Sequence, residues 1–142
     1  MSTYTDAKSL LIRHDHGVLS TYSDKIPGYP VGSLISYMVT EDGNVICWIS
    51  QIAQHTKNLN QHPKASLTIV PETPNLNKER LCLLIDPVQI QKGLPELKKA
   101  YIEKFPLAAQ YLDFHDFSPY HLKIKTAYYI GGFGRAEWID WE

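Results

Sequence analysis

The tetrapeptide Glu-Asp-Gly-Asn at residues 41–44 constrains the fold of this chain more than any other stretch. Asp-Gly between two strand-forming runs is a strong signal for a tight β-hairpin, since Gly readily adopts the backbone angles of such a turn. Apolar and β-branched residues dominate the flanking segments 33–40 and 45–50. The pattern therefore predicts two neighbouring strands that pair antiparallel.

The remaining patterns indicate a β-rich chain with short helices. Further strands are predicted at 18–22, 65–71, 81–91, 120–130 and 133–141, and helices at 3–14, 54–61, 95–104 and 107–112. Pro87 inside one predicted strand indicates a bulge or a sheet edge. Because the strands follow one another through hairpins and not through long helical crossovers, we expect a mainly β (α+β) fold. Its six or seven strands would form an antiparallel sheet or barrel with peripheral helices.

Composition limits the classes of function. A chain of 142 residues suggests one domain, and 44% hydrophobic residues are typical of a folded globular protein. A formal net charge of -1 provides no global attraction to nucleic acid or to a membrane. The N-terminal residues do not resemble a signal peptide, and no apolar run approaches the ~20 residues of a membrane span. We therefore expect a cytoplasmic protein with reduced cysteines.

The stretch SQIAQHTKNLNQHPKAS at 50–66 places hydroxyls and a lysine between a predicted strand and a predicted helix. A helix N-terminus presents free N–H groups that attract a phosphate. Ser50, Thr56 and Lys57 could complete a phosphate site there. An ordinary capped helix with a solvated Lys57 explains the same residues. The pattern alone leaves both interpretations open.

Other segments are also ambiguous. In GGFGRA at 131–136, the residues that follow are strand-like, so a dinucleotide-binding fold is not expected. Phe133 and Arg135 could face a planar anionic ligand or belong to a bulged strand. Six histidines show no zinc-ligand spacing, and no metal site is predicted from them.

Taken in order, six segments resemble the FMN-binding split barrels, the pyridoxamine 5'-phosphate oxidase-like proteins. These segments are GVLST (17–21), GYPVGS (28–33), EDGN (41–44), SQIAQHTKNLNQHPKASL (50–67), FHDFSPYHL (114–122) and IGGFGRAEWI (130–139). The HTKNL and GGFGRA sequences within them are most similar to the haem-utilisation branch. The resemblance implies an antiparallel split β-barrel that forms a homodimer, with FMN in equivalent clefts between the subunits.

The same resemblance implies a set of cofactor-binding residues. They are Ser33, Leu34, Ile35, Ser36, Ser50, His55, Thr56, Lys57, Asn58, Phe133 and Arg135. The first four would lie beside the flavin ring, and the residues from 50 to 58 would surround the phosphate. The last two would approach the flavin from the same subunit or from the other one.

The activity that the resemblance implies is an FMN-dependent oxidoreductase acting on an unknown small substrate. No catalytic residue is assigned; the candidates beside the expected cleft are His14, His16, Tyr29 and Arg135. The alternative is a non-catalytic flavin- or haem-binding protein, a carrier or a sensor, in which His14 or His16 is an axial ligand. The chain lacks the Arg-x-His element of the true oxidases, so vitamin B6 synthesis is not expected.

Overall fold

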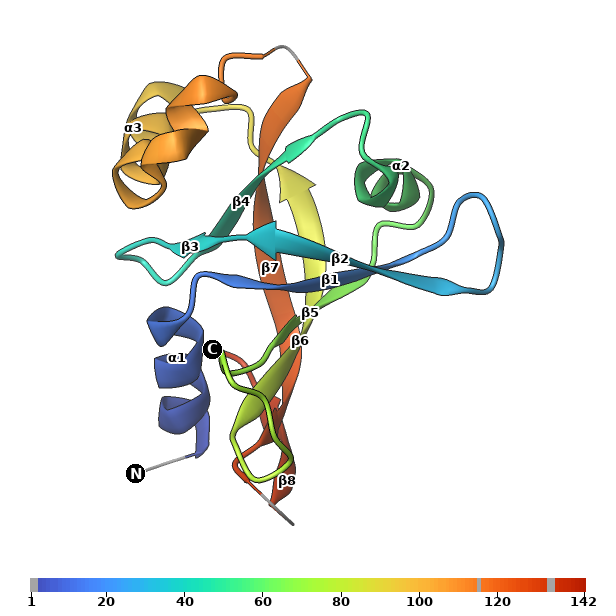
Figure 1. The fold of residues 1–142 in the computed structure, drawn as a ribbon, viewed down its shortest axis with the longest axis vertical. Coiled ribbons are helices and arrows are strands. Elements are labelled where there is room, and N and C mark those ends of the chain that lie inside the picture. Colours follow the sequence, from blue (N-terminus) through green and yellow to red (C-terminus); the bar gives the residue numbers. More distant parts are fainter. Residues whose placement is uncertain (1–2, 115, 133–134) are drawn as a thin grey trace.

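The computed structural model describes residues 3–114, 116–132 and 135–142. Along these residues the helices and strands alternate irregularly (Figure 1). The elements are α1 (Thr3–Arg13), β1 (His16–Tyr22), β2 (Pro30–Ser36), β3 (Met38–Val39), β4 (Val45–Ser50), α2 (Gln54–Gln61), β5 (Ala65–Ile69), β6 (Arg80–Gln89), α3 (Leu94–Lys104), η1 (Pro106–Gln110), β7 (Phe117–Ile130) and β8 (Ala136–Asp140).

The described strands form one antiparallel sheet in the order β2-β1-β5-β6-β7-β4-β3, and β8 pairs with β7. The 14-residue strand β7 organises this sheet. Its one edge pairs with β6, while its other edge pairs first with β4 and then with β8. The expected antiparallel, mainly β architecture with peripheral helices is confirmed, with eight strands in place of six or seven.

The additional strand arises because the predicted strand at 33–40 is interrupted at Tyr37. This buried residue donates its backbone N–H to the Asp15 carbonyl (2.9 Å) and its hydroxyl to the Leu11 carbonyl (2.6 Å). It thereby fixes the end of α1 against the sheet and separates β2 from β3. The hairpin predicted at 41–44 is confirmed, because β3 and β4 pair antiparallel and Gly43 has the positive φ of the turn (86°).

A bulge in β7 changes which of its residues face the core, from the even-numbered to the odd-numbered ones. The register between β6 and β7 skips Lys125, which is an exposed extra residue. Before the bulge the even-numbered Leu122 is buried, whereas beyond it the odd-numbered Ala127 and Tyr129 are buried. One extra residue therefore keeps both halves of the long strand in contact with the core.

The sequence predicts a bulge or a sheet edge at Pro87, in β6, and not a bulge in β7. Pro87 pairs with Leu122 without a bulge, but β5 covers β6 only from Leu81 to Ile85. Pro87 therefore lies at a local sheet edge, and that part of the expectation is confirmed. Proline is tolerated there because it has no N–H to offer a neighbouring strand.

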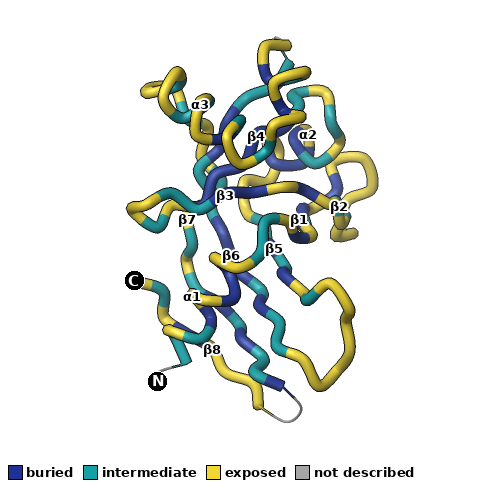
Figure 2. Tube along the Cα trace, turned by 60° about the vertical axis from the view of Figure 1, so that its left-hand side comes forward, coloured by how far each residue is buried: buried dark blue, intermediate teal, exposed yellow. Residues whose placement is uncertain are grey.

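Two groups of buried side chains make up the core. Figure 2 shows in dark blue where the buried residues lie along the chain. The larger group joins the inner face of the sheet to α1 through Ala7, Leu10 and Leu11. The smaller group joins β3 and β4 to α3 and η1, with Trp48 against Tyr101. Because β4 lies between the two groups, its residues from Val45 to Ile49 are all buried.

Glu79 connects three parts of the structure. Its carboxylate accepts hydrogen bonds from Arg13 of α1 (2.8 Å) and from the Tyr129 hydroxyl of β7. Partial burial opposes ionisation of Glu79, but these two hydrogen bonds outweigh it and hold the pKa of the carboxyl below its usual value. Burial and the Glu79 charge together raise the pKa of Tyr129 to about 12.

We predict that Glu79→Gln lowers the free energy of unfolding by about 1 kcal/mol at pH 7, as expected for a partly exposed charged hydrogen-bond pair. The folded state lowers the pKa of Glu79, so this stabilisation is complete above the ordinary glutamate value of 4.5. It is lost as the pH falls through the lower pKa of the folded state. Urea unfolding of both proteins from pH 7 to pH 3 measures the difference.

The matched control is Glu72→Gln, which changes an exposed glutamate in the loop before β6. This variant should unfold like the unmodified protein at every pH. A Glu79→Gln deficit that is the same at pH 3 and pH 7 would contradict a role for the carboxylate charge.

Candidate functional site

A cavity of about 320 Å³ lies where β2, β4 and the start of α2 meet the segment between α3 and β7. In Figure 1, α2 and α3 lie on either side of β4 at this end of the molecule. The cavity is lined by Leu34, Ile35, Ser36, Trp48, Ile49, Ser50, Ala53, His55, Tyr101, Tyr111 and Phe117. Its volume falls in the range of small-molecule sites. It brings together five of the cofactor residues predicted from the sequence.

One wall of the cavity is aromatic. Trp48 of β4 packs against Tyr101 of α3, with ring centroids 5.4 Å apart, and Tyr111 packs against Phe117 at 5.0 Å. These four residues are not among the cofactor-binding residues predicted from the sequence. They lie far apart in the chain and meet only because α3 and η1 fold back over β4. The wall offers an apolar, polarisable surface to a flat ligand.

The hydroxyls that the sequence assigned to a phosphate have partners within the protein. Ser50 Oγ donates to Asp116 Oδ2 (2.8 Å) and accepts from the backbone N–H of Ile52 (3.2 Å). Thr56 is fully buried and its Oγ1 donates to the Ser50 carbonyl (2.6 Å). Thr56 therefore fixes α2 onto the end of β4, and Ser50 stands beside a carboxylate.

Asn58 is buried and serves as a junction between α2 and the first strands. Its Nδ2 donates to Thr21 Oγ1 (2.9 Å), and its Oδ1 accepts from the Asp24 backbone N–H (2.9 Å). The same Oδ1 also accepts from Gln54 Nε2 (2.9 Å). Lys57, one residue earlier, is exposed and does not line the cavity.

His55 contributes a buried nitrogen to the cavity lining that has no hydrogen-bond partner in the described part of the chain. It is the second residue of α2, and its Nε2 is buried. Among the described residues, this nitrogen is the buried side-chain polar atom that has no hydrogen-bond partner. Burial also lowers the pKa of the imidazole, so the ring is neutral near pH 7.

The remaining predicted residues lie away from this cavity within one chain. Ser33 pairs with Leu19 in the sheet and is half-buried. Arg135 is exposed beside Gly131, at the end of β7 that lies far from α2 in Figure 1, with its Nη2 3.8 Å from Asp6 Oδ2. Phe133 lies outside the described residues. The candidate residues His14, His16 and Tyr29 do not line the cavity either.

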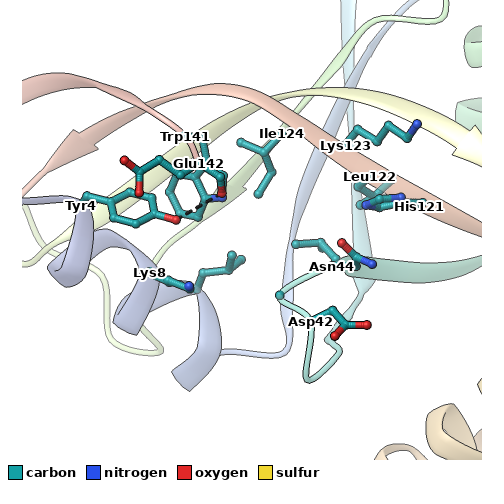
Figure 3. A pocket seen from close by; sticks show the side chains of 13 residues that line it. Tyr4, Lys8, Asp42, Asn44, His121, Leu122, Lys123, Ile124, Trp141 and Glu142 are labelled. Carbon is teal, nitrogen blue, oxygen red and sulfur yellow. Dashed lines mark hydrogen bonds between the residues drawn. The ribbon is translucent and has the colours of Figure 1, made fainter.

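Two other hollows contain none of the predicted cofactor residues. A cavity of about 240 Å³ lies between α1, the β3–β4 hairpin and β7. Figure 3 shows it with Tyr4 donating its hydroxyl to the Glu142 carbonyl (3.3 Å). A groove of about 710 Å³ follows the sheet near Ser20, Ser66 and Lys125. The part of the chain that the structure describes holds no cluster of three His, Cys, Asp or Glu side chains suited to a metal ion.

Comparison with known proteins places this geometry in a family. The sequence matches the model of the family "CREG, beta-barrel" over residues 3–142. It is 36% identical over 121 residues to the noncanonical heme oxygenase HOZ, chloroplastic, from Arabidopsis thaliana, covering 84% of this chain and 37% of the relative. The fold is similar to that of a heme binding protein from Mycobacterium smegmatis, with a TM-score of 0.86 and 25% identity over 99% of this chain and 58% of the other.

Similarity also extends to the pyridoxinephosphate oxidase family. A protein of that family from Clostridium acetobutylicum superposes with a TM-score of 0.71 at 13% identity, covering 96% of this chain and 93% of the other. At that identity the likeness concerns the split-barrel fold alone, and the expected split barrel is thereby confirmed. The chain spans 37% of the plant relative and 58% of the mycobacterial protein. Within the described residues, no helix is long and apolar enough to cross a membrane.

We predict that Asn58→Ala lowers the free energy of unfolding by about 2 to 3 kcal/mol, because it leaves buried donors and acceptors unpaired. The neighbouring Lys57→Ala should change it by less than about 0.5 kcal/mol, as expected at an exposed position. Chemical denaturation of both variants measures these effects. Equal and small effects would show that the Asn58 hydrogen bonds do not support the fold.

Proposed function

This chain belongs to the CREG β-barrel family, and from that membership we propose that it is a haem-binding split-barrel protein. The cavity bounded by β2, β4, α2 and the aromatic wall would hold the haem. One observation carries the proposal: an imidazole nitrogen without a partner is buried at an apolar, aromatic cavity. The plant relative is a heme oxygenase and the mycobacterial protein binds heme, and both support the same choice.

The residues of the cavity suit this cofactor. A porphyrin is flat and largely apolar, so Trp48, Tyr101 and Phe117 offer the contact surface that it requires. A haem iron needs a protein ligand along its axis, and a histidine nitrogen commonly provides it. When bound, haem supplies oxygen and electron chemistry, while the protein sets its ligation and polarity.

FMN, the cofactor first expected from the sequence, fits the polar contacts less well. Its phosphate carries about two negative charges near neutral pH. The hydroxyls of Ser50 and Thr56 are already hydrogen-bonded within the protein, and the Asp116 carboxylate beside Ser50 would repel an anion. Lys57 is the cation that remains near this turn, and it lies outside the cavity lining. An FMN-dependent oxidoreductase therefore stays the second candidate.

The first experiment titrates the purified protein separately with ferric haem and with FMN. We expect haem to bind with a shifted Soret band and to quench tryptophan fluorescence, because Trp48 lines the cavity. FMN should retain its free fluorescence. Trp48→Phe should remove most of the haem-dependent quenching, whereas Trp141→Phe should retain it, since Trp141 lines the separate cavity beside α1.

Tight FMN binding without haem binding would contradict the proposal and favour the flavoprotein. In that case Lys57→Ala should weaken FMN binding by about 1.5 to 3 kcal/mol, the value of a charged hydrogen bond. Riboflavin, which has no phosphate, should bind the variant and the unmodified protein equally.

We also propose that two copies of the chain form a homodimer through the outer face of the sheet. Residues in register form a continuous row across this face: Leu34, Val18, Thr68, Cys82, Tyr128 and Trp138. The ends of the row are open to solvent, with Leu34 73% and Trp138 65% exposed. Leu34 also lines the candidate cavity, so a partner on this face would close the open side of the haem site.

Sedimentation of the unmodified protein should give the mass of a dimer. Trp138→Lys should weaken dimerisation by about 2 kcal/mol, the value of an aromatic hot spot, because it places a charge on the proposed interface. Leu107→Lys is the matched control, since Leu107 is also exposed (73%, against 65% for Trp138) but lies in η1, away from the row. A monomer at all concentrations, or equal effects of the two variants, would contradict this interface.

A further inference from the structure

We infer that His55 is the axial ligand of the haem iron and that it binds the metal through Nε2. This inference rests on the proposed haem function and assigns its metal-binding atom. The sequence predicts His55 beside a cofactor phosphate, with His14 or His16 as candidate axial ligands. The hydrogen bonds around the cavity point instead to His55 and to a different role for it.

The neighbouring side chains of Ser50 and Thr56 form hydrogen bonds with other groups, and neither bonds His55. The Ser50 hydroxyl bonds Asp116 and the Ile52 backbone, and the Thr56 hydroxyl bonds the Ser50 carbonyl. Native proteins satisfy nearly all buried polar atoms, because a buried nitrogen without a partner is costly. The unpaired Nε2 of His55, a residue that lines a ligand-sized cavity, is explained if a bound group supplies the missing partner.

The backbone that carries His55 is held firmly. Thr56 ties the first turn of α2 to the end of β4, and Asn58 ties the next turn to Thr21 and Asp24. A ligand placed on a rigid element keeps its geometry when the metal binds. The imidazole has no hydrogen bond to a described residue that would have to break, and ligation requires the ring to turn so that the covered Nε2 reaches the cavity.

A porphyrin-bound iron suits this position better than a free metal ion. Free transition metals require three or four protein ligands, and no such group occurs among the residues that the structure describes. A porphyrin provides four nitrogens of its own, so one histidine completes the protein's share of the coordination. The aromatic wall around His55 then contacts the macrocycle.

The other described histidines have different surroundings. His14 Nδ1 donates to the Leu10 carbonyl (2.9 Å), and His16 Nδ1 lies 2.9 Å from Asp15 Oδ1. His62 is exposed at the end of α2 beside the Tyr22 ring, and His121 lines the cavity next to α1 shown in Figure 3. Within this set, His55 is the histidine that lines the aromatic cavity.

The test reconstitutes the full chain with ferric haem and compares the unmodified protein with His55→Ala. Resonance Raman spectra of the reduced complexes report the iron–histidine stretch, and labelling histidine with ¹⁵N should shift that band. We expect His55→Ala to lose the band while its residual haem still quenches Trp48. Added imidazole should restore a nitrogen-ligated spectrum in this variant. Circular dichroism and thermal unfolding verify that the variant folds.

His62→Ala is the matched control, because it removes an exposed histidine directly after the end of the same helix. It should retain the iron–histidine band, and so should His14→Ala. The inference is overturned if His55→Ala retains the band, or if the unmodified complex binds haem without it. Absence of haem binding to the unmodified protein is a separate result, because it removes the proposed function and the ligand assignment with it. If His55→Ala does not fold, His55→Gln replaces it with the same expected loss of the band.

Discussion

The structure depends on the pairing of β7, whose 14 residues belong to two branches of the sheet. On one edge β7 pairs with β6 from Tyr120 to Ile130, while on the other it pairs with β4 and then with β8. The change of partner splits the sheet, and the extra residue Lys125 keeps both halves of β7 facing the core. The branch that contains β4 carries the aromatic cavity, whereas the branch that contains β8 carries the end of the proposed dimer face.

The segment from Ser50 to Asn58 combines residues that hold α2 on the sheet with one residue, His55, that lines the cavity. Thr56 and Asn58 use their side chains to hold α2 on the sheet, and Ser50 bonds a carboxylate. These contacts are structural, and among the described residues they leave the Nε2 of His55, a residue of the cavity lining, buried without a partner. A motif that resembles a phosphate site in the sequence thus becomes a rigid support for one imidazole.

The proposed haem function therefore depends on the site and not on the fold. The same barrel occurs in a member of the pyridoxinephosphate oxidase family, at 13% identity, so the architecture alone does not choose a cofactor. The choice depends on which groups face the cavity. An aromatic wall, a neighbouring carboxylate and an imidazole favour a flat apolar metal complex over a phosphate.

The sequence by itself determined the order of elements, because hairpin signals, strand alternation and Gly or Pro breaks act over a few residues. The helix at 54–61 and the strand at 45–50 have the bounds that their local patterns predict. The sequence also placed Leu34, Ile35, Ser36, Ser50 and His55 at one site through their family pattern. Only the tertiary structure decided the break at Tyr37, the bulge at Lys125 and the aromatic wall. Each of these depends on contacts between distant residues, since a hydroxyl finds a carbonyl on another element and rings from β4, α3 and β7 meet only when the chain has folded.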